Sequence, residues 1–221
     1  MPNLPDFLKH KEQFQTIYGR NLLAEISNII PKKSLIVTME DLWDKWKGHF
    51  NHLDAQVHFA NSMEVTNLDE AINNFEPFHF VVGIGGGRAL DAAKYFAWQK
   101  NSKLFHVPTS MSVNAAFGQR SGVRINSEVK YIGWTTPEAV YIDYDIIQSA
   151  PKVVNRSGIC EIMCYHTAHL DWKYSSDQKK CEEKWPYNQE MVDEAKSVLN
   201  YLLEGMDDIK EVNERGIKRL M

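Results

Sequence analysis

The stretch FHFVVGIGGGRALDAAK, residues 78–94, decides the fold of this chain. Its first part, Phe78–Val82, is aromatic and β-branched, which is typical of a short buried strand in a parallel sheet. We expect the strand to enter a turn that has glycine at four of its five positions, namely Gly83, Gly85, Gly86 and Gly87. A helix follows in which alanines repeat along one face, so this helix can lie close against the sheet.

The glycines also predict a binding site. Without a Cβ atom they let a ligand approach the main chain, and their N–H groups can converge on an anion at the positive end of the helix. The spacing differs from the dinucleotide pattern G-x-G-x-x-G, because Arg88 stands at the last glycine position, and no Walker loop follows. The alternative is a plain turn that binds nothing. Because four glycines cost conformational entropy that a plain turn does not require, we favour a phosphate or pyrophosphate site.

Composition narrows the class of partner. The 221 residues have a formal net charge of −4 with basic and acidic residues interspersed, so we expect no nucleic-acid surface and no membrane contact. The three cysteines lack C-x-x-C spacing, which favours a reducing compartment. The N-terminal MPNLPDFLKHKEQ has no apolar signal segment, and no stretch approaches the roughly 18 apolar residues of a membrane span. We expect a cytoplasmic protein whose partner is a small molecule.

Strands and helices alternate through the first two thirds of the chain. The expected strands are Ser34–Met39, taken as the first, Ala55–Ala60, Ser102–Val107 and Ala139–Ile142, and the helices are Gly19–Ile30, Asp41–Phe50 and Asn67–Asn74. Such alternation predicts an α/β fold with a parallel sheet, a Rossmann-like nucleotide-binding domain over residues 1–150. A hairpin is expected around residues 127–128. Ligands of such sheets bind beyond the carboxyl ends of the strands.

The last third of the chain is predicted to be all-helical. Helical periodicity extends over Ser157–Tyr174, Gln189–Leu203 and Asp207–Leu220, after a boundary near Pro151. Residues 151–221 are therefore expected to form an incomplete helical domain. Helices such as Gln189–Leu203 normally pack on further helices, so we expect that the chain is unstable by itself, self-associates or needs a complementing C-terminal fragment.

Several motifs in order resemble one family. GGGRALDAAK (Gly85–Lys94), VPTSMSVNA (Val107–Ala115), PEAVYIDYDIIQSAP (Pro137–Pro151) and SGICEIMCYHTAHLDW (Ser157–Trp172) are similar to segments of the dehydroquinate synthase-like superfamily. This superfamily includes iron-containing alcohol dehydrogenases, glycerol dehydrogenases and sn-glycerol-1-phosphate dehydrogenases, and the last segment is most like the glycerol-1-phosphate branch. The resemblance implies NAD or NADP in the α/β domain, a divalent metal in the helical domain, and an alcohol or polyol phosphate in the cleft between them.

The resemblance also implies roles for individual residues. Gly85, Gly86 and Gly87 would cradle the pyrophosphate, and Asp91 would cap or buttress the turn. Either Glu40 or Asp41 would bind a ribose, which would favour NAD over NADP, although an acid at a helix start is commonly only a partner of the helix dipole. The nicotinamide half of the cleft would be lined by Thr109, Ser110, Ser112 and Ser121.

The implied metal site is incomplete. Glu161 stands where the family has a metal-binding aspartate, and Asn114 replaces a loop aspartate near the substrate; both are implied to be catalytic, and Glu161 to be a ligand of zinc, iron or nickel. The two metal-binding histidines of the family lie further downstream, but no histidine follows His169 in this chain. On a single helix, at about 100° per residue, His166 and His169 lie on another side than Glu161, so we expect surface or packing histidines.

Three functions remain open. The first is a metal-dependent dehydrogenase that transfers hydride between a secondary alcohol and the nicotinamide ring. The second is a nucleotide-binding remnant that lacks the metal-binding histidines and has no turnover. The third is a lyase of the dehydroquinate synthase type.

Overall fold

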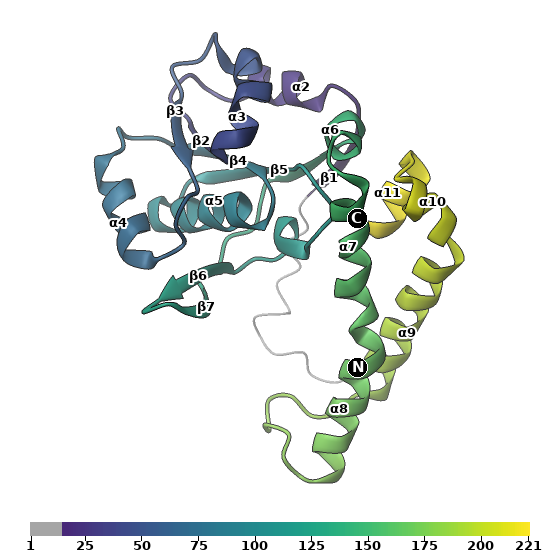
Figure 1. Ribbon diagram of the computed structural model, residues 1–221. Coiled ribbons are helices and arrows are strands. Elements are labelled where there is room, and N and C mark those ends of the chain that lie inside the picture. The colour runs from purple at the N-terminus through teal and green to yellow at the C-terminus, as the bar shows by residue number, and fades with distance from the viewer. Residues whose placement is uncertain (1–14) are drawn as a thin grey trace.

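A six-stranded parallel sheet forms the centre of the molecule, as the computed structural model shows for residues 15–221 (Figure 1). The residues that we examined for a signal segment, 1–13, lie outside the described part. The strand order is β1-β8-β5-β4-β2-β3. The bounds are β1 Gln15–Gly19, β2 Leu35–Thr38, β3 Gln56–Phe59, β4 Phe80–Gly85, β5 Lys103–Pro108 and β8 Ala139–Asp143. The α/β fold class predicted from the sequence is confirmed.

Helices cover both faces of this sheet. In the first part of the chain they are α2 Leu22–Ile29, α3 Glu40–Trp46, η1 Lys47–Phe50, α4 Val65–Asn74, α5 Gly87–Lys100, η2 Asn114–Ala116 and α6 Tyr144–Ser149. The side chains of β4 alternate between the two faces, as the two-residue period of a strand requires. Val81 packs with α4 and α5 on one face, whereas Val82 and Ile84 pack with α2 on the other. The sheet core is therefore buried from both sides.

Helix α5 lies very close to β4 because both elements have small residues where they meet. A Cβ atom on Gly83 would lie 2.7 Å from the Cβ of Ala93, so neither position has room for a larger side chain. Our prediction that Gly83 belongs to the turn is wrong: it lies inside β4, and only Gly85, Gly86 and Gly87 form the turn. Close packing explains Gly83, and Gly85 has a φ of 156°, a conformation that favours glycine.

Several predicted element bounds also need correction. Strand β1 was missed; it pairs in parallel with β8, with Gln15 opposite Ala139. Helix α2 begins at Leu22 rather than at residue 19, because Asn21 has a left-handed backbone with φ 56°. The helix predicted over 41–50 is divided into α3 and η1, and the one predicted over 157–174 is divided near Cys164.

A two-stranded antiparallel hairpin, β6 Ser121–Ile125 and β7 Glu128–Ile132, packs over α5 and α4 outside the main sheet. The backbone N–H of Arg124 donates to the carbonyl of Met63 at 2.7 Å, and the N–H of Ser127 donates to the Glu64 carboxylate at 3.0 Å. These contacts attach the hairpin to the loop that leads into α4.

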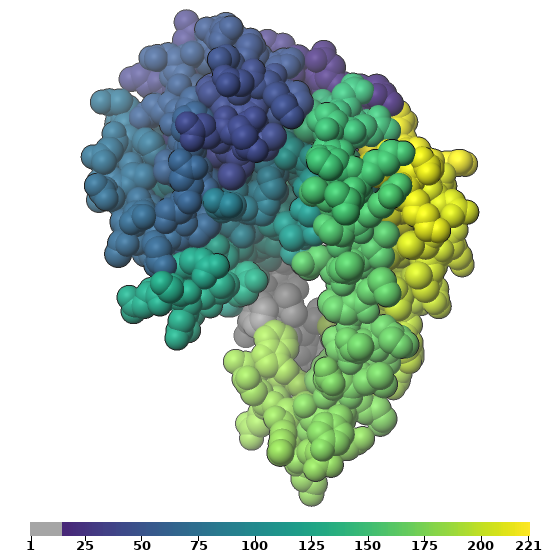
Figure 2. All heavy atoms as spheres, viewed as in Figure 1, coloured from purple at the N-terminus to yellow at the C-terminus, as the bar shows by residue number. Residues whose placement is uncertain are grey.

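The C-terminal third consists of α7 Lys152–Met163, α8 Tyr165–Asp177, α9 Gln189–Glu204, α10 Met206–Glu211 and α11 Glu214–Leu220. Helices α8 and α9 extend as an arm away from the sheet (Figures 1 and 2). None of residues 165–177 is buried. Helix α11 returns to the sheet, where Glu214 pairs with Arg20 at 2.7 Å. Among residues 15–221, no helix has the length and apolar character needed to cross a membrane.

Candidate functional site

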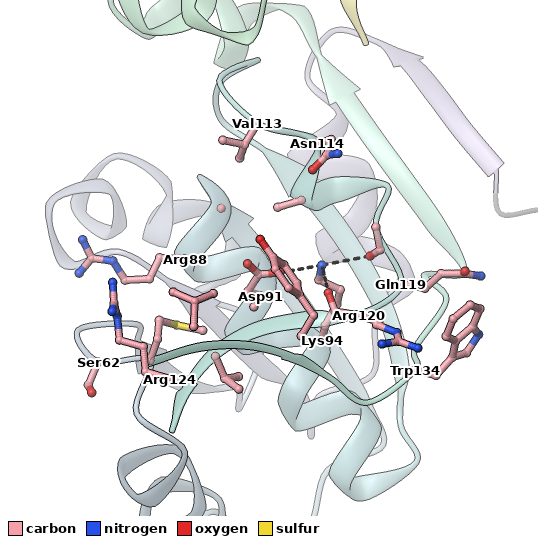
Figure 3. A pocket seen from close by; sticks show the side chains of 18 of the residues that line it. Ser62, Arg88, Asp91, Lys94, Val113, Asn114, Gln119, Arg120, Arg124 and Trp134 are labelled. Carbon is pink, nitrogen blue, oxygen red and sulfur yellow. Dashed lines mark hydrogen bonds and ion pairs between the residues drawn. The ribbon is translucent and has the colours of Figure 1, made fainter. Parts of the chain in front are cut away.

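A cavity of about 930 Å³ lies between α5, the hairpin and α7. Its walls come from the first turns of α5, the loop after β3, the loop that contains η2, both hairpin strands and one residue of α7 (Figure 3). These segments are far apart in the sequence. The parallel sheet brings the loops after β3, β4 and β5 to one edge, since the carboxyl ends of parallel strands point the same way.

The glycine turn lies at this edge and is open to a ligand. Gly85 ends β4 with φ 156°, and Gly86 precedes the first residue of α5 without a side-chain cap on the helix. A Cβ atom on Gly86 would meet nothing within 4 Å, whereas one on Gly85 would lie 2.7 Å from the Cβ of Ala89. Gly85 is therefore required by packing, and Gly86 leaves free space over the N–H groups at the positive end of α5. This open space fits an anionic group such as a pyrophosphate.

Asp91 does not cap the turn, which corrects one of the two roles that we considered for it. Its carboxylate pairs instead with the ammonium of Lys94 at 2.7 Å and accepts a hydrogen bond from the backbone of Gly122 in the hairpin. Burial raises the pKa of Asp91 and lowers the pKa of Lys94, while the attraction between the two groups opposes both shifts. The pair therefore connects the helix that follows the glycine turn to the hairpin.

Lys94 extends this connection to the loop before the hairpin. Its ammonium donates to the carbonyl of Gly118 at 3.0 Å and to that of Arg120 at 2.8 Å. Sequence reasoning did not assign a role to Lys94. The available signal was a lysine on the alanine-rich, buried side of a helix, three residues after an aspartate, because a buried lysine requires an acidic partner.

The loop after β5 is largely buried. The N–H of Thr109 donates to the carbonyl of Gly85 at 3.0 Å, and the Ser110 and Ser112 hydroxyls are 3.0 Å apart. Thr109, Ser110 and Ser121 are all buried. Their predicted contacts with a nicotinamide ring stay predictions.

Helix α7 is fixed to this loop by one buried side chain. The Asn155 side-chain oxygen accepts from the N–H of Met111 at 3.0 Å, and its amide donates to the carbonyl of Ile147 at 2.7 Å. Gly158 lies over the same loop, where a Cβ atom would overlap the carbonyl oxygen of Met111. The close contact of α7 places Glu161 at the edge of the cavity.

His106 on β5 contacts the same loop. Its Nδ1 lies 3.0 Å from the carbonyl oxygen of Ala116. Complete burial lowers the pKa of His106 to about 3, so the imidazole is neutral near pH 7.

Four of the predicted site residues line the cavity together, namely Gly87, Asp91, Asn114 and Glu161. The other predicted residues lie outside its lining: Glu40, Asp41, Gly85, Gly86, Thr109, Ser110, Ser112 and Ser121. The acids Glu40 and Asp41 are exposed in the first turn of α3. They directly follow Met39, whose side chain lies 3.7 Å from the Cβ position of Gly85. The two acids are therefore next to the glycine turn, on the side of β2.

The described residues do not form a metal site. Glu161 is exposed on α7, and among residues 15–221 no three His, Cys, Asp or Glu side chains gather closely enough to hold a metal ion. His166 and His169 lie on α8, with ring centroids 6.1 Å apart, and Nδ1 of His169 is 2.8 Å from the carbonyl of Tyr165. Their imidazoles do not join Glu161, so we assign no metal-dependent step to these residues.

Three arginines that sequence reasoning did not assign also line the cavity: Arg88, Arg120 and Arg124. Arg88 follows the glycine turn, Arg120 precedes the hairpin, and Arg124 lies on β6. They could not have been grouped from sequence spacing, because only the fold of the hairpin over α5 brings them to one cavity.

Comparison with known proteins finds relatives by sequence and by structure. The chain is 31% identical over 211 residues to glycerol-1-phosphate dehydrogenase [NAD(P)+] of Methanococcus aeolicus, covering 92% of this chain and 58% of that protein. A solved structure of a probable glycerol dehydrogenase from Sinorhizobium meliloti 1021 has the same fold, with a TM-score of 0.74 at 16% identity, covering 93% of this chain and 61% of that one.

Sulfoacetaldehyde reductase from Bifidobacterium kashiwanohense, solved in complex with NAD+, also shares the fold, with a TM-score of 0.64 at 14% identity over 94% of this chain and 63% of that one. The chain therefore spans about three fifths of the length of these proteins. The family described as iron-containing alcohol dehydrogenase matches residues 33–151. Because this match covers more than half of the sequence and includes the glycine turn, the chain belongs to the iron-containing alcohol dehydrogenase family.

Proposed function

We propose that this chain is the cofactor-binding part of an NAD(P)-linked dehydrogenase that acts on an alcohol or a polyol phosphate. The observation that supports this most directly is the open glycine turn at the start of α5, where a Cβ on Gly86 would meet nothing. A second support is the name of the relative from Methanococcus aeolicus, a glycerol-1-phosphate dehydrogenase that uses NAD(P)+. On this proposal residues 1–150 form the nucleotide-binding domain and residues 151–221 belong to a helical substrate domain.

The residues then have the following roles. The N–H groups at Gly85, Gly86 and Gly87 bind the pyrophosphate, and Glu40 or Asp41 accepts hydrogen bonds from a ribose. The hydroxyls of Thr109, Ser110 and Ser121, which are buried, and of Ser112, which is partly buried, shape the nicotinamide half of the site. Bound NAD(P) supplies the hydride acceptor or donor, and the protein orients the ring toward the alcohol carbon. Asn114 lines the cavity and offers a neutral amide to the substrate.

A second function is favoured by the lack of a metal cluster among residues 15–221. A chain that binds the nucleotide without a complete set of metal ligands would bind NADH but would not turn over. In that case, activity requires ligands beyond Glu161, from residues outside those described or from another chain.

The cofactor site can be tested by adding a side chain at Gly86. We expect Gly86→Val to weaken NADH binding at least tenfold, measured by nucleotide fluorescence, because the valine blocks approach to the main chain. The fold should not change, since the new side chain points into open space and φ is −83° at this position. Gly48→Val is the matched control, because a Cβ on Gly48 also meets nothing within 4 Å. Equal NADH affinity in the wild type and Gly86→Val would refute the site.

Turnover separates the two functions. NAD+ reduction would be followed with sn-glycerol 1-phosphate, glycerol and short alcohols after loading with zinc, iron or nickel. Turnover supports the dehydrogenase, whereas NADH binding without turnover supports the nucleotide-binding remnant.

A further inference from the structure

The charge of the cavity is opposite to that of the whole chain. The chain has a formal net charge of −4, but the cavity is lined by Arg88, Lys94, Arg120 and Arg124 against the two acids Asp91 and Glu161. Lys94 and Asp91 form a buried ion pair with each other. Three guanidinium groups therefore face one carboxylate, which is a formal excess of two positive charges in the cavity. Such an excess attracts anionic ligands.

Two of these arginines have donors available for a ligand. Arg88 forms no hydrogen bond or ion pair with any of residues 15–221. Arg124 donates from Nη1 to the carbonyl of Ser127 at 3.0 Å, which leaves its other guanidinium N–H groups available. Arg120 differs, because its guanidinium lies 6.0 Å from the centroid of the Trp134 ring.

The two arginines lie at the same end of the cavity. Figure 3 shows the side chains of Arg88 and Arg124 at one end of the cavity, near Ser62, and Arg120 with Trp134 at the other end. Arg88 belongs to the first turn of α5, and Arg124 comes from the hairpin that packs over that helix. Glu64 forms an isolated backbone bridge with Arg124, and its carboxylate accepts a hydrogen bond from the N–H of Ser127 at 3.0 Å.

We propose that Arg88 and Arg124 together bind a phosphate monoester in this cavity. The planar guanidinium fork matches the oxygens of a phosphate, and two forks from different elements bind a dianion better than a neutral hydroxyl. The proposal rests on the proposed function, because the phosphate belongs either to a phosphorylated polyol substrate or to the 2′-phosphate of NADP. An unphosphorylated alcohol with NAD would make no use of this pair.

The test compares each phosphorylated ligand with its unphosphorylated counterpart. Affinities for NADPH and NADH would be measured by calorimetry, and those for sn-glycerol 1-phosphate and glycerol would be measured with NADH present. The variants are Arg88→Ala, Arg124→Ala and the double variant. Lys130→Ala is the matched control, because Lys130 is a cation of the same hairpin that pairs with Glu128 outside the cavity lining.

We expect the wild type to bind at least one phosphorylated ligand about tenfold or more tightly than its unphosphorylated counterpart. Each alanine variant should reduce this ratio of affinities by about tenfold or more, because it removes hydrogen bonds to a charged group. Lys130→Ala should leave these ratios unchanged. If the alanine variants lose affinity only for NADPH, the site binds the cofactor phosphate. If they lose affinity only for glycerol 1-phosphate, the site binds the substrate phosphate. A ratio near one in the wild type, or an unchanged ratio in the double variant, overturns the proposal.

The failure of the proposed function would look different. If the wild type does not bind NADH but still binds glycerol 1-phosphate through the two arginines, the nucleotide assignment is lost and the phosphate site remains.

Discussion

The buried pair of Asp91 and Lys94 allows us to predict how much unfolding free energy the chain loses when the pair is broken. The two groups are 2.7 Å apart, and their side chains are only 19% and 2% exposed, respectively. In Lys94→Met, the Asp91 carboxylate keeps its burial but loses its counter-charge, and the carbonyls of Gly118 and Arg120 lose their donor. Breaking a buried pair from one side costs about 3–5 kcal/mol of unfolding free energy. Because Asp91 is partly exposed, we expect about 3 kcal/mol.

A surface pair of the same geometry provides the control. Lys47, the first residue of η1, and Asp44 of α3 have the same i,i+3 spacing and are 2.6 Å apart, but their side chains are 53% and 80% exposed. Exposed pairs contribute about 0–1 kcal/mol, because solvent screens the attraction. We therefore expect Lys47→Met to change the unfolding free energy by less than about 1 kcal/mol. The two lysine variants differ in the burial of the pair that they break and in the two carbonyl hydrogen bonds that Lys94 makes.

Urea unfolding followed by circular dichroism measures both effects. A double-mutant cycle with Asp91→Asn and Lys94→Met should show a coupling energy above about 1 kcal/mol, and the double variant should be more stable than the sum of the single losses predicts. If Lys94→Met has the same cost as Lys47→Met, then burial of the pair does not stabilise the fold and our reasoning is refuted. Should Lys94→Met fail to fold, the double variant provides the decisive comparison.

Two further predictions concern stability in acid and the contact of α7 with the loop after β5. The pKa of His106 is lowered to about 3 in the folded chain, so the unfolded chain takes up the proton at a higher pH than the folded chain does. The free energy of unfolding is therefore at its full value above about pH 6.5 and decreases as the pH falls toward 3, by up to about 5 kcal/mol. His106→Gln should flatten this part of the curve of unfolding free energy against pH, and an unchanged curve would refute the role of His106. Gly158→Ala should destabilise the chain by about 1–3 kcal/mol, the usual cost of overpacking a core, because the methyl group overlaps the carbonyl of Met111. A Gly158→Ala melting curve identical to that of the wild type would show that α7 does not rest on this loop.

Much of the sheet could be predicted because each of its central strands is a short apolar run that ends in turn residues. Strand β1 could not, since QTIYG is short and mixed in character. Its strand conformation depends on pairing with β8, with Gly19 opposite Asp143. That pairing joins residues more than a hundred positions apart, so the sequence around residue 15 does not show it.

The glycine turn was predictable for a similar reason: its conformational requirements are local to a few residues. The function of Asp91 was only partly predictable. Sequence reasoning placed it beside the turn but did not show that its partners are Lys94 and the backbone of Gly122. The meeting of Arg88 and Arg124 in one cavity depends on the hairpin packing over α5, which neither segment reveals by itself.

The residues of the glycine turn, the arginine pair and the buried ion pair meet at helix α5. The open position Gly86 directly precedes the helix, and its first turn presents Arg88 to the cavity. Its second turn presents Asp91 to the hairpin and Lys94 to the loop before the hairpin. Because the buried pair holds the hairpin through Gly122, it also fixes the strand on which Arg124 lies. Binding groups held by a second layer of buried contacts lose less freedom when a ligand arrives. Breaking the Asp91–Lys94 pair should therefore weaken phosphate binding through Arg124 as well as the stability of the fold.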